Sequence, residues 1–310
     1  MISKPSASVG VVVPCFNQGR FAAACIESLR QQTYKNWRAV LLDDASTDGE
    51  SGELCSALAS EHVKVVRLNN NLGRALIRNE GVRQLGGVDY ILSLDCDDYL
   101  SPTYIEQLVF ALDADPEIGL AYGLLQYVGA IREGRLSKTW PDKFWRHETI
   151  YQENLIPGPG TMFRAKALAE TAGWREDFTQ CSGEDYDIWL QVIEAGWKPL
   201  WVQDATYFYR QHENSFLAGA DLNTQLKIEL NILKHHYQGI RKSIGVETYL
   251  KKLIGPKLLG AIRTGDLNRA TNLGQQLWLL CPSITIWMLI KYYCGRVLVW
   301  ITRSKNYYAQ

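Results

Sequence analysis

Three carboxylates lie within four residues, directly after a run of apolar residues. Residues 90–94 have the length and composition of a buried strand, and Asp95, Asp97 and Asp98 follow it. Like charges at the end of a buried strand repel one another and are costly to desolvate, so they call for a counter-charge. A divalent cation held by carboxylate oxygens and substrate phosphates would supply it. A solvated acidic turn would explain the same residues, so the cluster needs support from the rest of the chain.

Polar side chains also follow three other apolar runs. Residues 14–17, 43–48 and 69–74 each come after a run of strand length, and Arg78 lies one helical turn further on. Each segment alone could be an ordinary turn, since Asn, Asp, Ser and Gly favour turns for local reasons. Four such loops at one edge of a sheet make a binding site the better explanation.

These loops belong to a pattern in which strands and helices alternate. Four apolar runs predict buried strands: 9–13, 39–42, 63–68 and 90–94. The apolar residues between them recur at helical spacing. Continuous apolar strands between amphipathic helices are typical of a mainly parallel sheet with both faces covered, and such sheets bind ligands at the carboxyl ends of their strands. Ser101 and Pro102 predict the N-cap and first residue of the next helix.

A second group of carboxylates opens another predicted helix. Glu184, Asp185 and Asp187 precede an apolar stripe that ends at Gly196. Acidic residues in a first helical turn suit the helix dipole, which is sufficient reason for their presence. Residues 157–160 predict a turn into a strand. Three tryptophans nearby could stack on a sugar, although most tryptophans fill the core: Trp140, Trp145 and Trp174.

Composition excludes several classes of protein. The chain has 310 residues, of which 46% are hydrophobic, and 33 basic residues balance 33 acidic ones. Zero net charge argues against a nucleic-acid binder, which relies on a positive field. Seven scattered cysteines without a Cys-x-x-Cys pair indicate a reducing compartment. The N-terminus lacks the pattern of a signal peptide, and no apolar run reaches 18 residues. We therefore expect a cytoplasmic protein.

Several of these motifs share one order and spacing. The segments are SVGVVVPCFN at 8–17, SL-x-QQTY at 28–34, DD-x-STD at 43–48, N-x-G at 71–73, RN at 78–79 and LDCDD at 94–98. In these residues the chain resembles the inverting family 2 glycosyltransferases with the GT-A fold, over about residues 8–215. The resemblance implies an α/β catalytic domain at 1–220 with a mainly parallel central sheet flanked by helices. Its nucleotide-sugar-binding half is 8–128 and its acceptor-side half 129–220, and a helical C-terminal region follows at 221–310.

The resemblance also implies roles for individual residues. Asp44 would accept a hydrogen bond from the uracil ring, with Asp43 supporting the loop, and Asp95 would lie near the ribose. The residues expected to bind the donor are Pro14, Cys15, Phe16, Asn17, Asp44, Arg78, Asp95, Cys96, Glu184 and Arg210.

The same resemblance implies a metal site and a catalytic base. Asp97 is the first candidate to bind Mn²⁺ or Mg²⁺, with Asp95, Asp98 and His212 as further candidates; for His212 an ordinary surface position explains the residue equally well. Asp185 matches the position of the family's catalytic base, which takes the proton of the acceptor hydroxyl as its oxygen attacks the anomeric carbon.

The activity implied is transfer of one sugar, with inversion, from a nucleotide sugar to a saccharide or lipid-linked saccharide during cell-surface glycan synthesis, with UDP as the expected nucleotide. The chain lacks the Gln-x-x-Arg-Trp motif of processive synthases and the Gly-x-Gly-x-x-Gly motif of dehydrogenases. A sugar nucleotidyltransferase is disfavoured because the chain lacks a Gly-rich basic loop after the first strand. Two alternatives stay open: a non-catalytic nucleotide-sugar-binding protein and a polyprenyl-phosphate glycosyltransferase.

The last ninety residues have helical patterns, and two roles for these helices are open. Residues 277–301 are rich in Trp, Leu, Ile and Tyr, but Pro282 and charged residues interrupt them. We favour helices packed on the catalytic domain. The alternative is peripheral contact with the inner face of the plasma membrane through an interfacial surface, whose basic residues would be Lys291, Arg296, Arg303 and Lys305.

Overall fold

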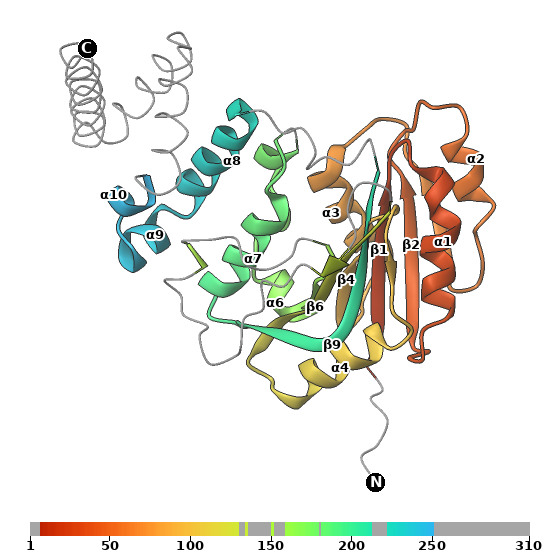
Figure 1. The fold of residues 1–310 in the computed structure, drawn as a ribbon, viewed down its shortest axis with the longest axis horizontal. Coiled ribbons are helices and arrows are strands. Elements are labelled where there is room, and N and C mark those ends of the chain that lie inside the picture. Colours follow the sequence, from red (N-terminus) through yellow and green to blue (C-terminus); the bar gives the residue numbers. More distant parts are fainter. Residues whose placement is uncertain are drawn as a thin grey trace, which may run out of the picture. The chain divides into compact units, whose positions relative to one another are not determined.

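A computed structural model of the protein describes residues 7–129, 134–135, 150–151, 159–179, 181–212 and 222–250. The chain separates into two compact units, Met1–Ala220 and Asp221–Gln310. The first unit contains all the residues expected to bind donor or metal and the expected base. Figure 1 shows the described strands and helices of the chain.

Strands and helices alternate through the first ninety residues, in the order β1 (Val9–Cys15), α1 (Gly19–Arg30), β2 (Trp37–Asp43), α2 (Ser51–Ser56), β3 (Val63–Arg67), α3 (Gly73–Leu85) and β4 (Tyr90–Ser93). β1 pairs in parallel with both β2 and β4, and β2 pairs in parallel with β3. The four strands predicted from apolar runs are therefore confirmed.

The rest of the first unit extends the same sheet. Its elements are β5 (Tyr99–Leu100), α4 (Tyr104–Ala114), β6 (Ile118–Gly129), β7 (Gly134–Arg135), β8 (Met162–Arg164), α6 (Ala165–Ala169), a 3₁₀ turn at Glu176–Phe178, α7 (Glu184–Glu194) and β9 (Lys198–Gln211). The strand order is β3-β2-β1-β4-β8-β6-β9-β5, with β7 paired to β6. β8 is antiparallel to β4 and β6, whereas β6 and β9 are parallel. β4, β6 and β9 thus run in one direction.

Both faces of β1 are covered, which explains its continuous apolar sequence. Val9, Val11 and Val13 belong to the core cluster that includes the inner sides of α1 and α4. Val12 faces α3 instead, where a Cβ added to Gly81 would lie 2.3 Å from a Val12 methyl carbon. Glycine at position 81 therefore lets α3 approach the sheet closely.

The expected start of the helix after the acidic cluster is wrong by two residues. α4 begins at Tyr104, with Thr103 rather than Ser101 at its N-cap position. The Ser101 side chain instead links the segment before α4 to β9, because its Oγ accepts a hydrogen bond from the Thr206 backbone N–H at 3.2 Å. This long-range contact outweighs the local capping preference.

Of the three tryptophans considered for stacking on a sugar, the structure describes one. Trp174 is buried and packs edge-on against Phe163, so it fills the core rather than presenting a sugar-stacking surface. Trp140 and Trp145 lie outside the described residues.

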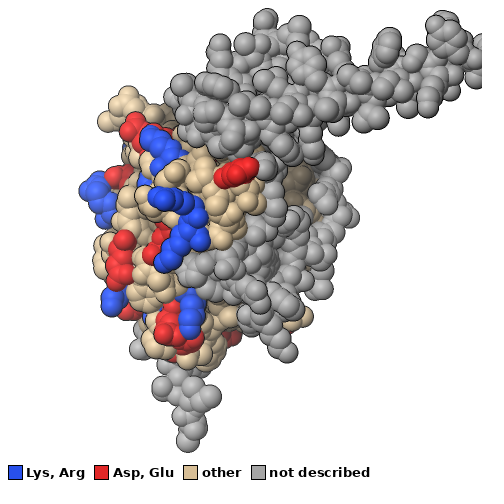
Figure 2. All heavy atoms as spheres, turned by 90° about the vertical axis from the view of Figure 1, so that its left-hand side faces the viewer, with Lys and Arg blue, Asp and Glu red and all other residues tan. Residues whose placement is uncertain are grey.

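The second unit is helical where it is described, with α8 (Leu222–His235), α9 (Tyr237–Ser243) and α10 (Val246–Tyr249). The interrupted apolar segment at 277–301 and the basic residues after it lie outside the described residues. In the described part of the chain, no helix is both long and apolar enough to cross a membrane. On the described surface in Figure 2, basic side chains are interspersed with acidic ones.

Candidate active site

The carboxyl ends of several strands meet at one edge of the sheet. The parallel register places Cys15, at the end of β1, beside Asp43, at the end of β2, and pairs Val12 with Ser93 at the end of β4. β9 runs in the same direction as β4, so Arg210 and His212 reach the edge that carries the acidic cluster. This edge therefore unites residues that are up to 198 positions apart, from Pro14 to His212.

Two loops at this edge are interlocked through Asn17. Its backbone N–H donates to Ser46 Oγ at 2.9 Å, and its Oδ1 accepts from the Thr47 N–H at 2.8 Å. Asn17 has a left-handed φ of 55°, a conformation that asparagine tolerates better than most residues. The exposed Asn17 side chain is thus used to join the loops after β1 and β2.

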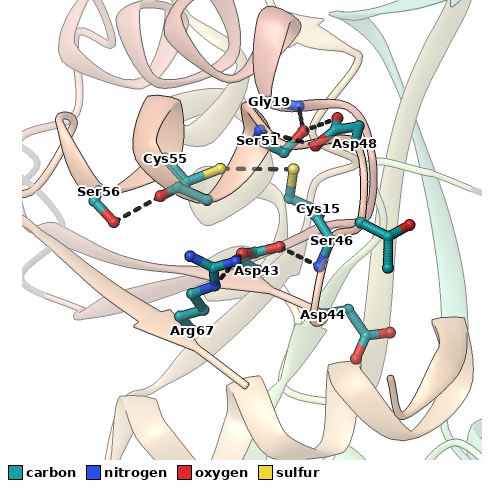
Figure 3. A network of polar contacts seen from close by, with 12 residues as sticks. Cys15, Gly19, Asp43, Asp44, Ser46, Asp48, Ser51, Cys55, Ser56 and Arg67 are labelled. Atoms are coloured by element: carbon teal, nitrogen blue, oxygen red, sulfur yellow. Dashed lines mark hydrogen bonds and ion pairs between the residues drawn. The ribbon is translucent and has the colours of Figure 1, made fainter. Parts of the chain in front are cut away.

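The paired carboxylates after β2 have separate partners. Asp43 Oδ1 accepts from the Ser46 N–H at 3.0 Å, and Arg67 lies 3.3 Å from Oδ2, as Figure 3 shows. Asp44 points the other way and accepts the N–H groups of Leu72 and Gly73 at 2.7 and 2.9 Å, holding the start of α3. Burial raises the pKa of Asp44. Asp44 is 3% exposed, so a base N–H would have to reach the remaining lone pairs of its carboxylate through the small part that is accessible.

The side chains of two expected donor-binding residues point away from the edge. Cys15 and Cys96 are buried in the core, where Cys15 Sγ lies 3.6 Å from Cys55 Sγ (Figure 3). This corrects the expectation for their side chains, although their backbones still border the edge. Phe16, by contrast, is 43% exposed and Pro14 is partly buried, so both can face a ligand.

The three clustered aspartates have different surroundings. Asp98 is 1% exposed, and both its oxygens accept hydrogen bonds: Oδ2 from the Tyr207 hydroxyl at 2.6 Å and Oδ1 from the Arg210 N–H at 2.7 Å. Asp98 therefore fastens β9 to the acidic loop, which argues against the metal-binding role expected for it. Asp95 is partly exposed, with Oδ1 held by Arg78 at 2.8 Å.

Asp97, the second of the three clustered aspartates, contacts the His212 imidazole. Its Oδ2 accepts from Gln18 Nε2 at 2.9 Å and lies 2.9 Å from His212 Nε2. Burial, followed by the negative charge of Asp95, raises the pKa of Asp97. The Arg210 side chain also reaches this residue, because its Nε donates to the Asp97 carbonyl at 2.8 Å.

Within the described ranges, no group of three or more His, Cys, Asp and Glu side chains is arranged to hold a metal ion. Asp97 and His212 nevertheless form a carboxylate and imidazole pair of the kind that Mn²⁺ accepts. Ions of this class commonly take one or two protein ligands and complete their shell with substrate phosphates and water. The fit to a divalent cation therefore depends on a diphosphate.

Arg78 is a buried connection between two parts of the site. It is 3% exposed and donates to Ser93 Oγ at 3.1 Å, Asp95 Oδ1 at 2.8 Å and Glu184 Oε1 at 3.1 Å. Its guanidinium is thus occupied by protein groups, contrary to the expectation that it would bind the donor. Glu184 is likewise buried in this ion pair rather than exposed to a donor.

Asp185 differs from both of its acidic neighbours. Glu184 pairs with Arg78, and Asp187 is fully buried between Arg175 and Gln191. Asp185 is half-buried, and no hydrogen bond joins its carboxylate to the described residues. Burial raises its pKa to about 7; the Arg78 charge lowers it, and the charges of Glu184 and Asp95 raise it further. A carboxylate with this pKa is suited to accept a proton near neutral pH.

The structure adds Gln18 and Phe21 to the residues of the site. Both come from the start of α1, and both contact the group around Asp97, through the Gln18 hydrogen bond and through stacking of Phe21 on the His212 ring. The sequence signal for Gln18 was only its position just after the 14–17 motif. Phe21 also followed the helical spacing of the apolar residues, which predicts a helix face that packs on the sheet rather than a contact with His212.

Comparison with known proteins gives a consistent family. The model for glycosyl transferase family 2 matches residues 10–170, which is more than half of the chain. EpsE of Bacillus subtilis (strain 168), assigned as a glycosyltransferase, is 29% identical over 214 residues, covering 67% of this chain and 74% of EpsE. WcaA of Escherichia coli (strain K12), assigned as a glycosyl transferase of colanic acid biosynthesis, is 22% identical over 67% of this chain and 82% of WcaA. Several other curated relatives are much longer, and the matches span 18–39% of them.

A solved structure supports the fold. The crystal structure of GalNAc-T7 with UDP, GalNAc and Mn²⁺ matches with a TM-score of 0.57 at 16% identity, over 72% of this chain and 47% of that chain. At this identity the likeness concerns the fold alone, and it shows that the mixed sheet of the first unit is that of the GT-A glycosyltransferases.

Proposed function

The chain belongs to glycosyl transferase family 2, and from this premise we propose that Asp185 is the base of a metal-assisted, inverting transfer of one sugar. The acceptor hydroxyl oxygen attacks the anomeric carbon and its proton passes to the Asp185 carboxylate. The bond between the sugar and the diphosphate breaks, and the nucleoside diphosphate leaves with the bonding electrons. One displacement inverts the anomeric centre.

The observation that carries this proposal is the contrast among the three carboxylates at the start of α7. Arg78 and Arg175 engage Glu184 and Asp187, whereas Asp185 is half-buried with a pKa raised to about 7. A general base works best when its pKa lies near the operating pH and its oxygen is unoccupied. A carboxylate that serves only the helix dipole acts through its negative charge, and a pKa raised to about 7 works against that charge.

The donor side of the proposal assigns roles to the strand-end residues. Asp44 accepts a uracil N–H, Phe16 and Pro14 border the base, and the second oxygen of Asp95 accepts a ribose hydroxyl while Arg78 fixes the first. Asp97 and His212 would hold a divalent cation, Mn²⁺ or Mg²⁺, which supplies charge neutralisation at the departing diphosphate. Arg210 lies beside them as a fixed cation.

For the substrates, we propose the nucleotide of the donor and the chemical class of the acceptor. UDP is favoured because Asp44 offers an acceptor to a base N–H and because GalNAc-T7, which shares the fold, was solved with UDP. A saccharide or lipid-linked saccharide of a cell-surface glycan is favoured as acceptor because WcaA is assigned to colanic acid biosynthesis. The cytoplasmic location stays a prediction, and contact of the C-terminal helices with a membrane stays the alternative to packing on the catalytic domain.

A donor screen followed by one substitution tests the proposal. Hydrolysis of UDP, GDP and TDP sugars in the presence of Mn²⁺ identifies the donor, and Asp185→Asn is then compared with the protein as it is. We expect UDP affinity within about twofold and transfer lowered by at least ~100-fold, the scale of general-base catalysis. Asp204→Asn, at an exposed carboxylate on β9, is the matched control and should leave transfer unchanged.

Two outcomes would contradict the assignment. Transfer at the unsubstituted rate in Asp185→Asn would make Asp185 a helix-start residue and place the base elsewhere. Tight UDP binding with no turnover of any donor or acceptor pair would favour the non-catalytic nucleotide-sugar-binding protein.

A further inference from the structure

We propose that Phe21 is a positioning residue, which holds His212 and Arg210 in place beside the Asp97 carboxylate. This inference rests on the proposed function, because it assigns to Phe21 the ordering of the groups that receive the metal and the diphosphate. Phe21 itself touches neither in this scheme and acts through the two β9-end residues.

The contacts around Phe21 are specific in geometry. Its ring stacks on the His212 imidazole with centroids 5.0 Å apart and an angle of 28° between the planes. The Arg210 guanidinium carbon lies 5.1 Å from the same ring centroid and 5.5 Å from that of Tyr99. The Arg210 guanidinium therefore contacts two aromatic rings, one from α1 and one from β5.

These contacts complement the hydrogen bonds to Asp97. His212 Nε2 lies 2.9 Å from Asp97 Oδ2, and Arg210 Nε donates to the Asp97 carbonyl at 2.8 Å. A hydrogen bond through Nε2 sets the position of one ring atom, whereas stacking sets the plane of the ring. Both are needed to direct an imidazole lone pair, because metal–ligand bonds require a defined direction.

The platform that carries Phe21 is itself fixed. The Gly19 N–H donates to Ser51 Oγ at 2.7 Å, and the Ser51 hydroxyl donates to Asp48 Oδ2 at 2.5 Å, as Figure 3 shows. A Cβ added to Gly19 would lie 2.4 Å from the Ser51 Cα, so glycine permits this close approach of α1 to α2. Phe21 then follows in the first turn, with its N–H bonded to the Gln18 carbonyl at 2.9 Å.

A simple packing role explains Phe21 less well. The residue is half-buried rather than part of the core, and two guanidinium groups lie over its ring, with the Arg20 carbon at 4.7 Å and the Arg210 carbon at 5.1 Å. Leucine would fill a similar volume but would offer neither a stacking plane nor a negative ring face. The ring, rather than apolar volume alone, is what these contacts use.

The test compares Phe21→Leu and Phe21→Tyr with the unsubstituted full chain. Phe110→Leu, at a 45% exposed ring on α4, is the matched control. The first measurement is the ¹⁵N NMR spectrum of ¹⁵N-labelled histidine without any metal, with the His212 signals assigned by their loss in His212→Gln. Imidazole ¹⁵N shifts report the hydrogen bond between His212 and Asp97, whereas loss of the Phe21 ring current would alter carbon and proton shifts even if His212 did not move. The second is UDP affinity in Mn²⁺ and in a chelator.

We expect Phe21→Leu to move the His212 Nε2 ¹⁵N signal away from its position in the unsubstituted protein, because the hydrogen bond to Asp97 is loosened. We also expect it to reduce the Mn²⁺-dependent gain in UDP affinity roughly tenfold, the scale of a desolvated cation–π contact. Phe21→Tyr, which keeps the ring, and Phe110→Leu should change neither. If Phe21→Leu leaves the His212 signals and the Mn²⁺ gain as they were, the inference is overturned.

Failure of the proposed function has a different signature. If the unsubstituted protein gains no UDP affinity from Mn²⁺, the metal role proposed above is wrong. The His212 spectrum then still decides whether Phe21 positions the imidazole, and an unchanged spectrum in Phe21→Leu overturns that as well.

Discussion

At the scale of residues, the same carboxylate group has different properties according to its surroundings. Asp98 is fully hydrogen-bonded and Asp95 is tied to an arginine, whereas no hydrogen bond joins the Asp185 carboxylate to the described residues. Desolvation favours the protonated form of a carboxylate, and at Asp185 it outweighs the nearby Arg78 charge, which is why the pKa of this residue is raised to about 7. The free energy that this costs the fold is a reason to assign the residue a function.

The titration of Asp185 predicts opposite effects of pH on activity and stability. A base must be deprotonated, so transfer should fall as pH falls through about 7. The folded pKa lies above its ordinary value near 4, so the protonated form is favoured by folding, and that stability is lost as pH rises towards about 7. Asp185→Asn, which cannot ionise, should therefore gain stability relative to the unsubstituted protein as pH rises.

Urea unfolding at pH 5 and pH 8 checks the stability half of this prediction, and a pH–rate profile checks the other. Asp204→Asn is again the control, because that carboxylate is exposed. A stability difference between Asp185→Asn and the unsubstituted protein that is equal at both pH values would contradict a raised pKa.

At the scale of elements, Arg78 joins three parts of the fold. It extends from α3 to the end of β4, through Ser93 and Asp95, and to the start of α7, through Glu184. The edge proposed to bind the donor and the helix of the proposed base are therefore connected by one buried guanidinium. Arginine suits this place because its planar group donates several hydrogen bonds in fixed directions.

Removing that connection should be costly. Arg78→Met leaves the buried Glu184 carboxylate without its partner, and we expect the free energy of unfolding to fall by about 3–5 kcal/mol in urea. Arg83→Met on the same helix removes a surface ion pair with Glu80 and should change stability little. Adding Glu184→Gln to Arg78→Met should restore part of the loss, and no restoration would contradict the ion-pair explanation.

At the scale of the whole molecule, no group of three or more His, Cys, Asp and Glu side chains among the described residues is arranged to hold a metal ion, so under the proposed function Asp97 and His212 would need the donor diphosphate to complete a metal site. UDP should therefore bind more tightly in Mn²⁺ than in a chelator, on the order of tenfold or more, and Asp97→Ala should abolish the difference. Calorimetric titration measures both. Equal UDP affinity in Mn²⁺ and chelator would rule out the metal assignment, and an unchanged difference in Asp97→Ala would move it to other residues.

The sequence by itself determined the alternation of strands and helices, the family and the loops that carry the site. Apolar runs and helical spacing are local signals, and parallel strands bring their carboxyl ends to one edge whatever the details of packing. The 14–17, 43–48 and 95–98 motifs therefore lie at one edge, as expected.

Only the tertiary structure decided which side chains in those motifs are available to a ligand. Asp98 is occupied by Tyr207 and the Arg210 backbone, Cys15 and Cys96 point into the core, and Phe21 meets His212 from the opposite end of the domain's sequence. Burial and the partners of a charged group depend on residues more than a hundred positions away. The residues around a motif in the sequence do not show which distant residues will contact it. Side chains of the same type in one motif could therefore not be distinguished without the tertiary structure.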